Sequence, residues 1–208
     1  EQDFKQAVEW YRKSADQGNV RAQFNLGLCY DTGQGVEQDF KQAVEWYRKS
    51  ADQGNVRAQF NLGLCYDTGQ GVEQDFKQAV EWYRKSADQG LTAAQYGLAD
   101  CYETGQGVKQ NSRRAWRWFR KAANQNHIGS HIKCAELILE PNDVPRDLFV
   151  VRILRHRLLA RRSELTPEQR TTLQSLGRQY PGQLQCHRPG CTKTDWWLED
   201  SDFDSDMK

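Results

Sequence analysis

Long hydrophobic runs are missing from this chain of 208 residues. No stretch approaches the roughly 20 apolar residues that a membrane-spanning helix requires, which excludes such a helix. The sequence also lacks a secretory signal peptide, and it begins with Glu1 rather than Met. A fragment and a processed form therefore both stay open, and the sequence constrains localisation poorly.

An excess of either charge is also missing. Lys and Arg number 29 and Asp and Glu number 28, which gives a formal net charge of +1. This balance argues against a histone-like or polyanion-like chain. Hydrophobic residues make up 38% of the sequence, which is low for a compact globule. An elongated helical array with a large surface tolerates such a composition.

Motifs of enzymatic chemistry are missing too. The sequence has no nucleophile motif, no glycine-rich phosphate loop and no carboxylate pair that stands apart from the repeat described below. His127, His131 and His156 have no acid or thiol at a telling spacing, and we interpret them as surface or junction residues. The sequence therefore predicts no enzyme, no cofactor, no metal site and no small-molecule substrate.

What the chain does contain is an internal repeat. Residues 1–36 recur letter for letter as residues 37–72, and the identity continues to Gly90. The third copy then diverges in sequence and ends at Val108, and a degenerate fourth copy follows it. The period is 36 residues throughout. Self-similarity of this kind predicts a solenoid, because each short unit needs its neighbours to complete a core.

The first half of each period predicts a helix. In the second copy Asp39 is the expected N-cap, and Gln42 is the residue that would complete a capping box. Gly54 is the expected stop, since glycine adopts a left-handed cap without steric cost. One face then carries apolar side chains at helical spacing, namely Phe40, Ala43, Val44, Tyr47 and Ala51.

The second half predicts another helix, from about Val56 to Asp67. Its apolar stripe consists of Ala58, Leu62, Cys65 and Tyr66. We expect it to end in a turn at Gly69 and Gly71, two residues that are free to adopt positive φ. Two short amphipathic helices per period favour an all-α fold.

The segment AQFNLGLCYDTGQGVEQDFKQAVEWYRKSADQGN resembles a Sel-1-like repeat, a relative of the tetratricopeptide repeat. The shared residues are Ala58, Leu62, Gly63, Tyr66, Gly69, Gly71, Val72, Asp75, Ala79, Trp82, Tyr83, Ala87 and Gly90. The resemblance covers roughly residues 1–140. It implies a right-handed superhelix that binds proteins or peptides and has no catalytic centre. Copies this similar indicate recent duplication or consensus design, and the sequence does not separate the two.

The predicted fold class is therefore a right-handed α-solenoid of 36-residue helix-turn-helix repeats with C-terminal capping helices. We expect three parts: the repeat array over residues 1–140, the capping helices over residues 141–180, and an irregular or disordered acidic segment over residues 181–208. We expect a monomer.

The resemblance implies that the second helix of each pair lines a concave wall. A helical wheel then selects the residues opposite the core stripe, which we call the candidate groove: Arg21, Phe24, Leu28, Asp31, Arg57, Phe60, Leu64, Asp67, Tyr96, Asp100 and Glu103. Phe, Leu and Tyr rimmed by acids suit an amphipathic or extended peptide with some positive charge. The alternative is that Phe24 and its copies pack against the adjacent helix as core.

Tryptophan recurs with the same period, at Trp10, Trp46 and Trp82, and the degenerate copy carries Trp116 and Trp118. Large apolar side chains at repeat junctions seal one unit onto the next. We therefore interpret these residues as structural.

Cysteine spacing decides how to interpret the six cysteines. Cys29, Cys65 and Cys101 are 36 residues apart and lie on the apolar stripe, and Cys134 replaces a core leucine. Equivalent helices of a solenoid lie about 10 Å apart or more, which is too far for a disulfide. We therefore expect four buried free thiols. Secreted relatives carry paired cysteines in each repeat, so their absence here favours a reducing compartment such as the cytoplasm, with a secreted or host-delivered bacterial protein as the alternative.

The other two cysteines lie in Cys186-His187-Arg-Pro-Gly-Cys191. Zinc requires four ligands and this segment offers three, with an awkward adjacent Cys-His pair. A local disulfide across the Pro-Gly turn and two ordinary thiols are the alternatives.

The C-terminal part predicts capping helices. Residues 146–162 form a basic amphipathic pattern, and a second helix begins at Thr166-Pro167-Glu168-Gln169 with Thr as N-cap and ends at Gly177. The ELTPEQRTTLQSLGRQY segment resembles the terminal helix after many bacterial Sel-1-like arrays. Covering the end of the solenoid is the favoured role, and binding of a membrane or an acidic partner is the alternative.

Charge is distributed in blocks. Residues 1–108 carry a net charge of −5, residues 109–145 +4, residues 146–194 +7 and residues 195–208 −5. We call residues 195–208, DWWLEDSDFDSDMK, the acidic tail. Its composition predicts disorder or folding on contact, so it is either a solubilising or a docking segment. Opposite blocks permit the acidic tail to lie across the basic surface and compete with an acidic partner.

Two functions remain. The favoured one is a non-catalytic scaffold or adaptor that binds a protein or peptide partner in the candidate groove. The alternative is binding of nucleic acid or an anionic surface through the basic stretch Lys109–Lys133, which has no acid and has Trp116, Trp118 and Phe119 interleaved among its cations. A steep loss of affinity with salt would indicate the second function.

Overall fold

The computed structural model describes residues 2–139, 144, 158 and 162–179. Within these residues the chain forms α-helices, one short 3-10 helix (Arg162–Glu164) and no strand. The α-helices are α1 (Gln2–Asp16), α2 (Val20–Thr32), α3 (Phe40–Asp52), α4 (Val56–Thr68), α5 (Phe76–Asp88), α6 (Thr92–Thr104), α7 (Ser112–Asn124), α8 (Ile128–Leu139) and α10 (Pro167–Gln179). The predicted all-α class is confirmed.

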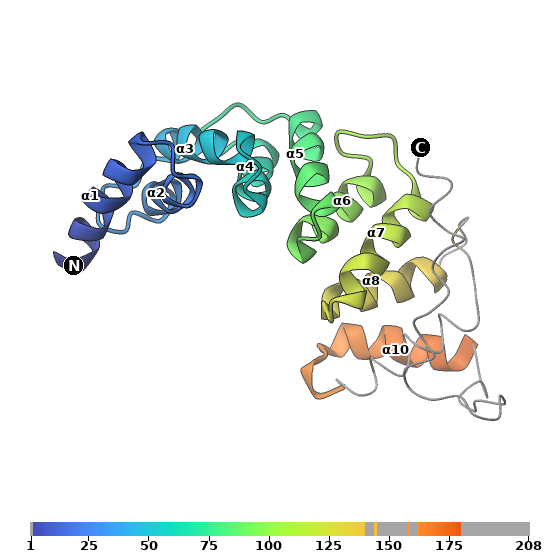
Figure 1. Cartoon of the computed structure of the whole chain (residues 1–208). Helices are drawn as coiled ribbons and strands as arrows, with labels where there is room; N and C mark the ends of the chain where they lie inside the picture. Colours follow the sequence, from blue (N-terminus) through green and yellow to red (C-terminus); the bar gives the residue numbers. More distant parts are fainter. Residues whose placement is uncertain (1, 140–143, 145–157, 159–161, 180–208) are drawn as a thin grey trace, which may run out of the picture.

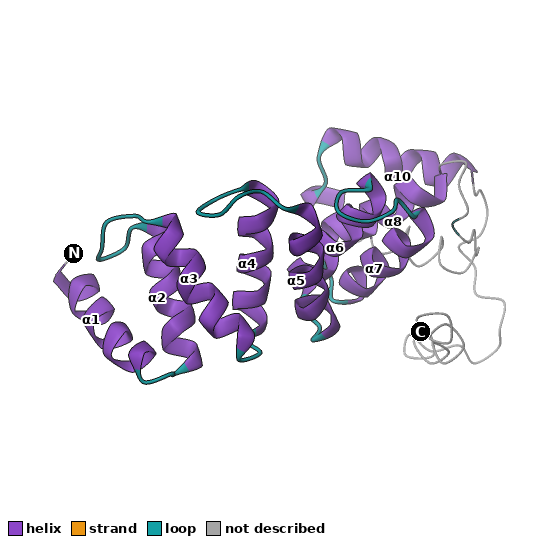
Figure 2. Cartoon of the chain, turned by 90° about the horizontal axis from the view of Figure 1, so that it is seen from above, coloured by secondary structure: helices purple, strands orange, loops and turns teal. Residues whose placement is uncertain are grey.

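The helices follow one another in a curved row. Each of α1 to α7 packs on the next helix in the sequence, and α10 packs on α8. Figure 1 shows the resulting arc, which runs from α1 at one end to α10 at the other, and Figure 2 shows the same row from above. This arrangement is an α-solenoid, in which a unit is completed by its neighbours.

The odd-numbered internal helices begin at an acidic or amide cap. The Asp39 carboxylate accepts hydrogen bonds from the backbone N–H groups of Lys41 and Gln42, at 2.9 and 3.1 Å. The expected reciprocal half of the capping box is wrong, because the N–H of Asp39 donates to the carbonyl of Tyr30 at 2.9 Å instead. The same tertiary bond recurs from Asp75 to Tyr66. The cap therefore also anchors each odd helix to the preceding even helix.

The predicted glycine stops are confirmed. Gly54 follows the last residue of α3 and its cap with φ +89°, and Gly69 and Gly71 adopt φ +76° and +70° after α4. Gly71 has a second reason to lack a side chain, since a Cβ there would collide with the carbonyl of Phe40. The turn therefore lies directly on the start of the preceding odd helix.

A buried glutamine joins three consecutive helices. Gln59 on α4 donates from Nε2 to the carbonyl of Ala51 on α3 at 3.2 Å, and its Oε1 accepts from Gln89 at the end of α5 at 2.8 Å. Gln23 and Gln95 make the equivalent contacts in their copies. These bonds satisfy a polar group that would otherwise be costly to bury, and they fix neighbouring units relative to each other.

The tryptophans behave as junction residues where a preceding unit exists. Trp46 packs against the core of α1 and α2, and Trp82 belongs to the core of α3 and α4. Trp10 occupies the same position in α1, the first helix, and is 70% exposed. A lysine ammonium lies over each ring, for example Lys85 at 3.7 Å from the centroid of Trp82. The structural interpretation is confirmed for Trp46 and Trp82.

Four cysteines are free thiols, as predicted. Cys65, Cys101 and Cys134 are buried, whereas Cys29 is only partly buried. Burial raises the pKa of Cys65 and of Cys101 to about 12. These three buried thiols act as small apolar side chains in the core.

The last described helix covers the core at the C-terminal side. Thr166 and Gln169 form a reciprocal capping box, with N–H to side-chain distances of 2.9 and 3.3 Å, so the predicted start of α10 is confirmed. The predicted stop at Gly177 is wrong, because α10 continues to Gln179. Leu165, Leu173 and Leu176 join the core that α7 and α8 form.

Several expectations fall outside the described residues. Of the basic helix expected over residues 146–162, only Leu158 and Arg162 are among the described residues. Leu158 is buried in the same core as Leu165, Leu173 and Leu176. Cys186, His187, Cys191, His156 and the acidic tail also lie outside. Among the described helices, none is both long and apolar enough to cross a bilayer.

Candidate partner-binding surface

The candidate groove comes from three even-numbered helices. Four of its residues lie on α2, the same four types lie at equivalent positions on α4, and Tyr96, Asp100 and Glu103 lie on α6. The side chains of Arg21, Leu28, Arg57 and Leu64 are exposed, whereas the aromatic and acidic members are half-buried. The predicted residues therefore differ in what they offer to a partner.

The aromatic members pack on the following odd helix. The rings of Phe24 and Tyr47 lie 6.0 Å apart between centroids, and those of Phe60 and Tyr83 lie 5.7 Å apart, both tilted by 33°. Tyr96 meets Phe119 edge-on at 5.2 Å. The alternative that these aromatic residues pack against the adjacent helix is therefore correct for all three ring pairs. Each of Phe24, Phe60 and Tyr96 is also partly exposed.

The first two acids of the candidate groove are held by tyrosines. Asp31 Oδ2 accepts a hydrogen bond from the Tyr47 hydroxyl at 3.0 Å, and Asp67 Oδ2 accepts one from the Tyr83 hydroxyl at 3.2 Å. Burial, together with the adjacent carboxylate, raises the pKa of Tyr47 and of Tyr83 well above the usual range. Asp31 and Asp67 are therefore acids whose carboxylates are positioned by tyrosine hydroxyls.

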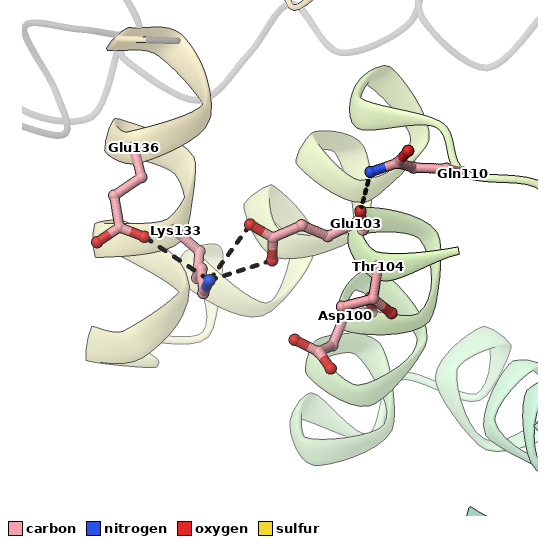
Figure 3. A network of polar contacts seen from close by, with 6 residues as sticks. All are labelled: Asp100, Glu103, Thr104, Gln110, Lys133 and Glu136. Carbon is pink, nitrogen blue, oxygen red and sulfur yellow. Dashed lines mark hydrogen bonds and ion pairs between the residues drawn. The ribbon is translucent and has the colours of Figure 1, made fainter. Parts of the chain in front are cut away.

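The third copy replaces this pair with an ion pair. Phe119 takes the place of the tyrosine and has no hydroxyl, and Lys133 on α8 instead reaches Glu103, with Nζ 3.2 Å from each carboxylate oxygen. Glu136 lies 3.7 Å from the same ammonium. Burial raises the pKa of Glu103 against the opposing pull of Lys133. Figure 3 shows Lys133 between the two glutamates.

Asp100 differs from the other acids. It stands where the first two copies have Leu28 and Leu64, and its carboxylate makes no hydrogen bond or ion pair with any described residue (Figure 3). Only its backbone carbonyl is used, as the acceptor of the Thr104 hydroxyl at 2.9 Å. Asp100 therefore offers an uncompensated negative charge on α6.

Leu28 and Leu64 supply the exposed apolar surface. They are 37% and 40% exposed, and apart from Phe4 and Trp10 on α1 they are the large hydrophobic side chains that stay exposed among the described residues. A leucine at one position of two consecutive even helices makes a repeated apolar feature rather than a scattered one.

Sequence reasoning missed Lys133. A signal was present, because Phe119 aligns 36 residues after Tyr83 and so removes the hydroxyl that holds the acid in the earlier copies. Of the two interpretations of His131, a surface or a junction residue, the surface one is wrong, because the side chain is buried and contacts the carbonyl of His127 through Nδ1 at 2.9 Å. His127 is a half-buried junction residue, and burial lowers its pKa.

The aromatic residues of the basic stretch Lys109–Lys133 do not offer the exposed rings that base stacking requires. Trp116, Trp118 and Phe119 are 2%, 6% and 0% exposed, so their rings belong to the core and are not free to stack on bases. That part of the nucleic-acid alternative is wrong. Lys109, Arg113, Arg114 and Lys121 remain exposed.

Among the described residues, no group of three or more His, Cys, Asp or Glu side chains is arranged to hold a metal ion. A depression of about 420 Å³ lies between α8 and α10, and it contains none of the candidate-groove residues.

Comparison with known proteins identifies the repeat. The Sel1 repeat family model matches residues 1–19, 20–55, 56–91 and 92–127. The match ends before α8, which the sequence resemblance had included. No curated protein sequence matches the chain.

Two solved structures are similar over most of the chain. One is a protective antigen present in uropathogenic Escherichia coli strains and displaying an SLR fold, at 35% identity and a TM-score of 0.72 over 76% of this chain. This chain spans only 34% of that antigen. The other is a Sel1 repeat protein from Oxalobacter formigenes, at 30% identity and a TM-score of 0.73 over 82% of this chain and 69% of that one. The chain belongs to the Sel1 repeat family, whose members typically act as scaffolds for protein interactions.

Proposed function

We propose that the chain is a non-catalytic scaffold that binds a protein or peptide segment in the candidate groove, along α2, α4 and α6. The observation that carries the proposal is the pair Leu28 and Leu64, which stay 37% and 40% exposed at equivalent positions of consecutive even helices. Exposed leucines that recur with the structural period favour a contact surface over chance exposure. Family membership supports the same class of function.

The chemistry of the groove indicates the kind of segment. Two apolar positions, each beside a half-buried phenylalanine, suit two apolar anchors of a ligand. Asp100 on α6 then favours a basic side chain, because its carboxylate has no partner among the described residues. Arg21 and Arg57 are exposed about two helical turns before the leucines, and they favour acidic or carbonyl groups of a ligand at that end. The ligand is therefore an extended or amphipathic segment with apolar anchors followed by a basic residue.

A library selection tests the proposal. Random peptides displayed on phage are selected on the full chain, and we expect recovered sequences to combine apolar residues with Lys or Arg. The same selection uses Leu28→Gln/Leu64→Gln as bait, which removes the apolar surface and keeps a good helix former at both positions. The matched control is Lys41→Gln/Lys77→Gln, at two exposed and equivalent positions of α3 and α5. Enrichment that survives the leucine changes would remove the candidate groove from the account.

A further inference from the structure

Helix α7 differs in charge from its own copies. The segment 73–90, which contains α5, carries three bases and four acids, for a net charge of −1. The aligned segment 109–126, which contains α7, carries six bases and no acid, for a net charge of +6. The two segments keep the same fold, so the change of charge is not needed to form the helix pair.

The cations gather on the outer side of α7, and we call them the basic face: Lys109, Arg113, Arg114, Arg117, Arg120 and Lys121. Within the helix they recur at spacings of three and four residues, which place them on one side. Ala115, Trp116 and Phe119 point to the opposite side and are buried. Four members of the basic face, Lys109, Arg113, Arg114 and Lys121, are therefore exposed surface residues, and Arg117 and Arg120 are half-buried.

Aromatic rings hold several of these cations at the surface. Lys121 Nζ lies 4.4 Å from the centroid of Trp118, and Arg114 Cζ lies 5.7 Å from that of Tyr102. A ring face orients a cation without neutralising its charge. Among the described residues, none of the exposed Lys109, Arg113, Arg114 and Lys121 pairs with a carboxylate. These four exposed cations of the basic face thus carry positive charge that no described carboxylate neutralises.

We propose that the basic face of α7 is the docking surface for the acidic tail of the same chain. The acidic tail contains six acids and one base, so its net charge of −5 complements the +6 of the segment that carries the basic face. It also contains Trp196, Trp197 and Phe203, whose rings can pack on arginine side chains. This surface is separate from the candidate groove and does not depend on the proposed function.

The length of the connecting chain allows this contact. Helix α10 ends at Gln179 and packs on α8, which packs on α7. Packed helices lie about 8–10 Å apart, so α10 and α7 are separated by about 20 Å. Residues 180–194 can span up to about 50 Å when extended, at roughly 3.3 Å per residue. The acidic tail can therefore reach the basic face within one molecule.

Tethering makes a weak contact sufficient. A connection as short as residues 180–194 can hold the acidic tail at an effective concentration on the order of 1 mM. If the intrinsic dissociation constant is about 0.1 mM, the acidic tail occupies the basic face about 90% of the time. An external acidic segment must then displace the acidic tail, which makes the tail a competitive regulator of this surface.

Nucleic acid is the less favoured occupant. Single strands bind through cations combined with aromatic rings on which bases stack. The aromatic rings beneath the basic face are buried, so α7 offers the cations without the stacking platform. An acidic peptide needs only the cations and fits this surface better.

Hydrogen exchange of the full chain tests the proposal. Amides of residues 195–208 that the contact shields from water are expected to exchange up to about tenfold more slowly than those of a synthetic peptide of the same sequence, which is the limit that about 90% occupancy sets. Arg113→Glu/Arg114→Glu should remove this protection, and so should 0.5 M NaCl. Lys77→Glu, at the position of α5 equivalent to Arg113, is the control and should leave the protection intact.

Charge exchange separates a direct contact from an indirect effect. Asp202→Lys/Asp204→Lys should also remove the protection, and combining it with Arg113→Glu/Arg114→Glu should restore at least half of it. Equal exchange of the acidic tail and the free peptide would overturn the proposal, as would protection that survives reversal of the basic face. An unprotected tail together with binding of a 20-nucleotide oligo(dT) that depends on Arg113 and Arg114 would assign the basic face to nucleic acid instead.

Discussion

Lys133 on α8 places its ammonium nitrogen 3.2 Å from each carboxylate oxygen of Glu103 on α6. In the two earlier copies a tyrosine hydroxyl on the intervening odd helix holds the equivalent aspartate. The array therefore keeps a partner for this acid by two chemical routes, one neutral and one ionic. The route changes where Phe119 replaces tyrosine, and the spare acid Asp100 appears in the same copy.

Removing Lys133 should make the stability depend more strongly on pH. Burial raises the pKa of Glu103, so its contribution to folding is present at low pH and is lost as pH rises through the pKa of the folded state. Lys133 opposes this loss. Lys133→Met should therefore lower the free energy of unfolding by about 1 kcal/mol at pH 7 and by less at pH 5.

Urea unfolding at the two pH values measures the difference. The control is Lys133→Met/Glu103→Gln, which removes the Glu103 carboxylate and leaves only the more exposed Glu136 without the ammonium, and it should recover stability at pH 7. An equal loss of stability at pH 5 and pH 7 would show that Lys133 acts through packing rather than through Glu103.

Tyr83→Phe should destabilise the chain by about 1 kcal/mol, because it leaves the half-buried Asp67 without its 3.2 Å hydroxyl donor. The control is Tyr11→Phe, in a segment of identical sequence, since the Tyr11 hydroxyl makes no hydrogen bond with a described residue. That change should alter the free energy of unfolding by no more than about 0.5 kcal/mol. Equal effects of the two substitutions in urea unfolding would contradict a stabilising role for the Asp67 contact.

Gly71→Ala should be considerably more damaging than Gly54→Ala. Both glycines have positive φ, and nothing lies within 4 Å of a Cβ built at Gly54, so that change should cost about 1–2 kcal/mol. A Cβ at Gly71 would also collide with the Phe40 carbonyl, and the cost should rise to about 3 kcal/mol or more. Thermal unfolding of the two variants compares them directly. A similar melting temperature would mean that the turn moves freely away from α3.

Cys29 should react with iodoacetamide faster than Cys65 at pH 8, although their helices have the same sequence. Burial raises the pKa of both thiols, but Cys29 is only partly buried, whereas Cys65 is buried and its pKa rises to about 12. Tryptic peptides 22–41 and 58–77 are identical, so peptide mapping does not separate the two sites.

Single variants in a Cys186→Ser/Cys191→Ser background separate them. Loss of the fast-reacting thiol in Cys29→Ser and its retention in Cys65→Ser is the expected pattern in a timed alkylation followed by intact mass. The opposite pattern would contradict the burial difference.

Much of the fold was predictable because its signals are local. The caps at Asp39 and Thr166, the stops at Gly54 and Gly69 and the apolar stripes depend on residues within one or two turns of a helix. The period then requires each unit to pack on the next. These rules give the helices and their order without any knowledge of long-range contacts.

The side-chain contacts between neighbouring units could not be predicted from these local signals. The Glu103–Lys133 pair and the Gln59–Gln89 bond each join residues 30 positions apart, and a helical wheel of one helix has no information on them. The burial of Trp116, in contrast, agrees with its interpretation as a structural residue, and Trp116 stands where the earlier copies have a buried valine. The candidate groove was selected by the same single-helix wheel, which explains why it mixed exposed leucines with half-buried aromatics.

The central claim is that Leu28 and Leu64 contact the partner. The most direct test is the dissociation constant of one selected peptide, measured by calorimetry for the full chain, for Leu28→Gln/Leu64→Gln and for Lys41→Gln/Lys77→Gln. Loss of two half-exposed leucine anchors should weaken binding about tenfold or more, which corresponds to about 1.4 kcal/mol. The lysine control should stay within about twofold of the unchanged chain. Equal dissociation constants for the two double variants would contradict the claim.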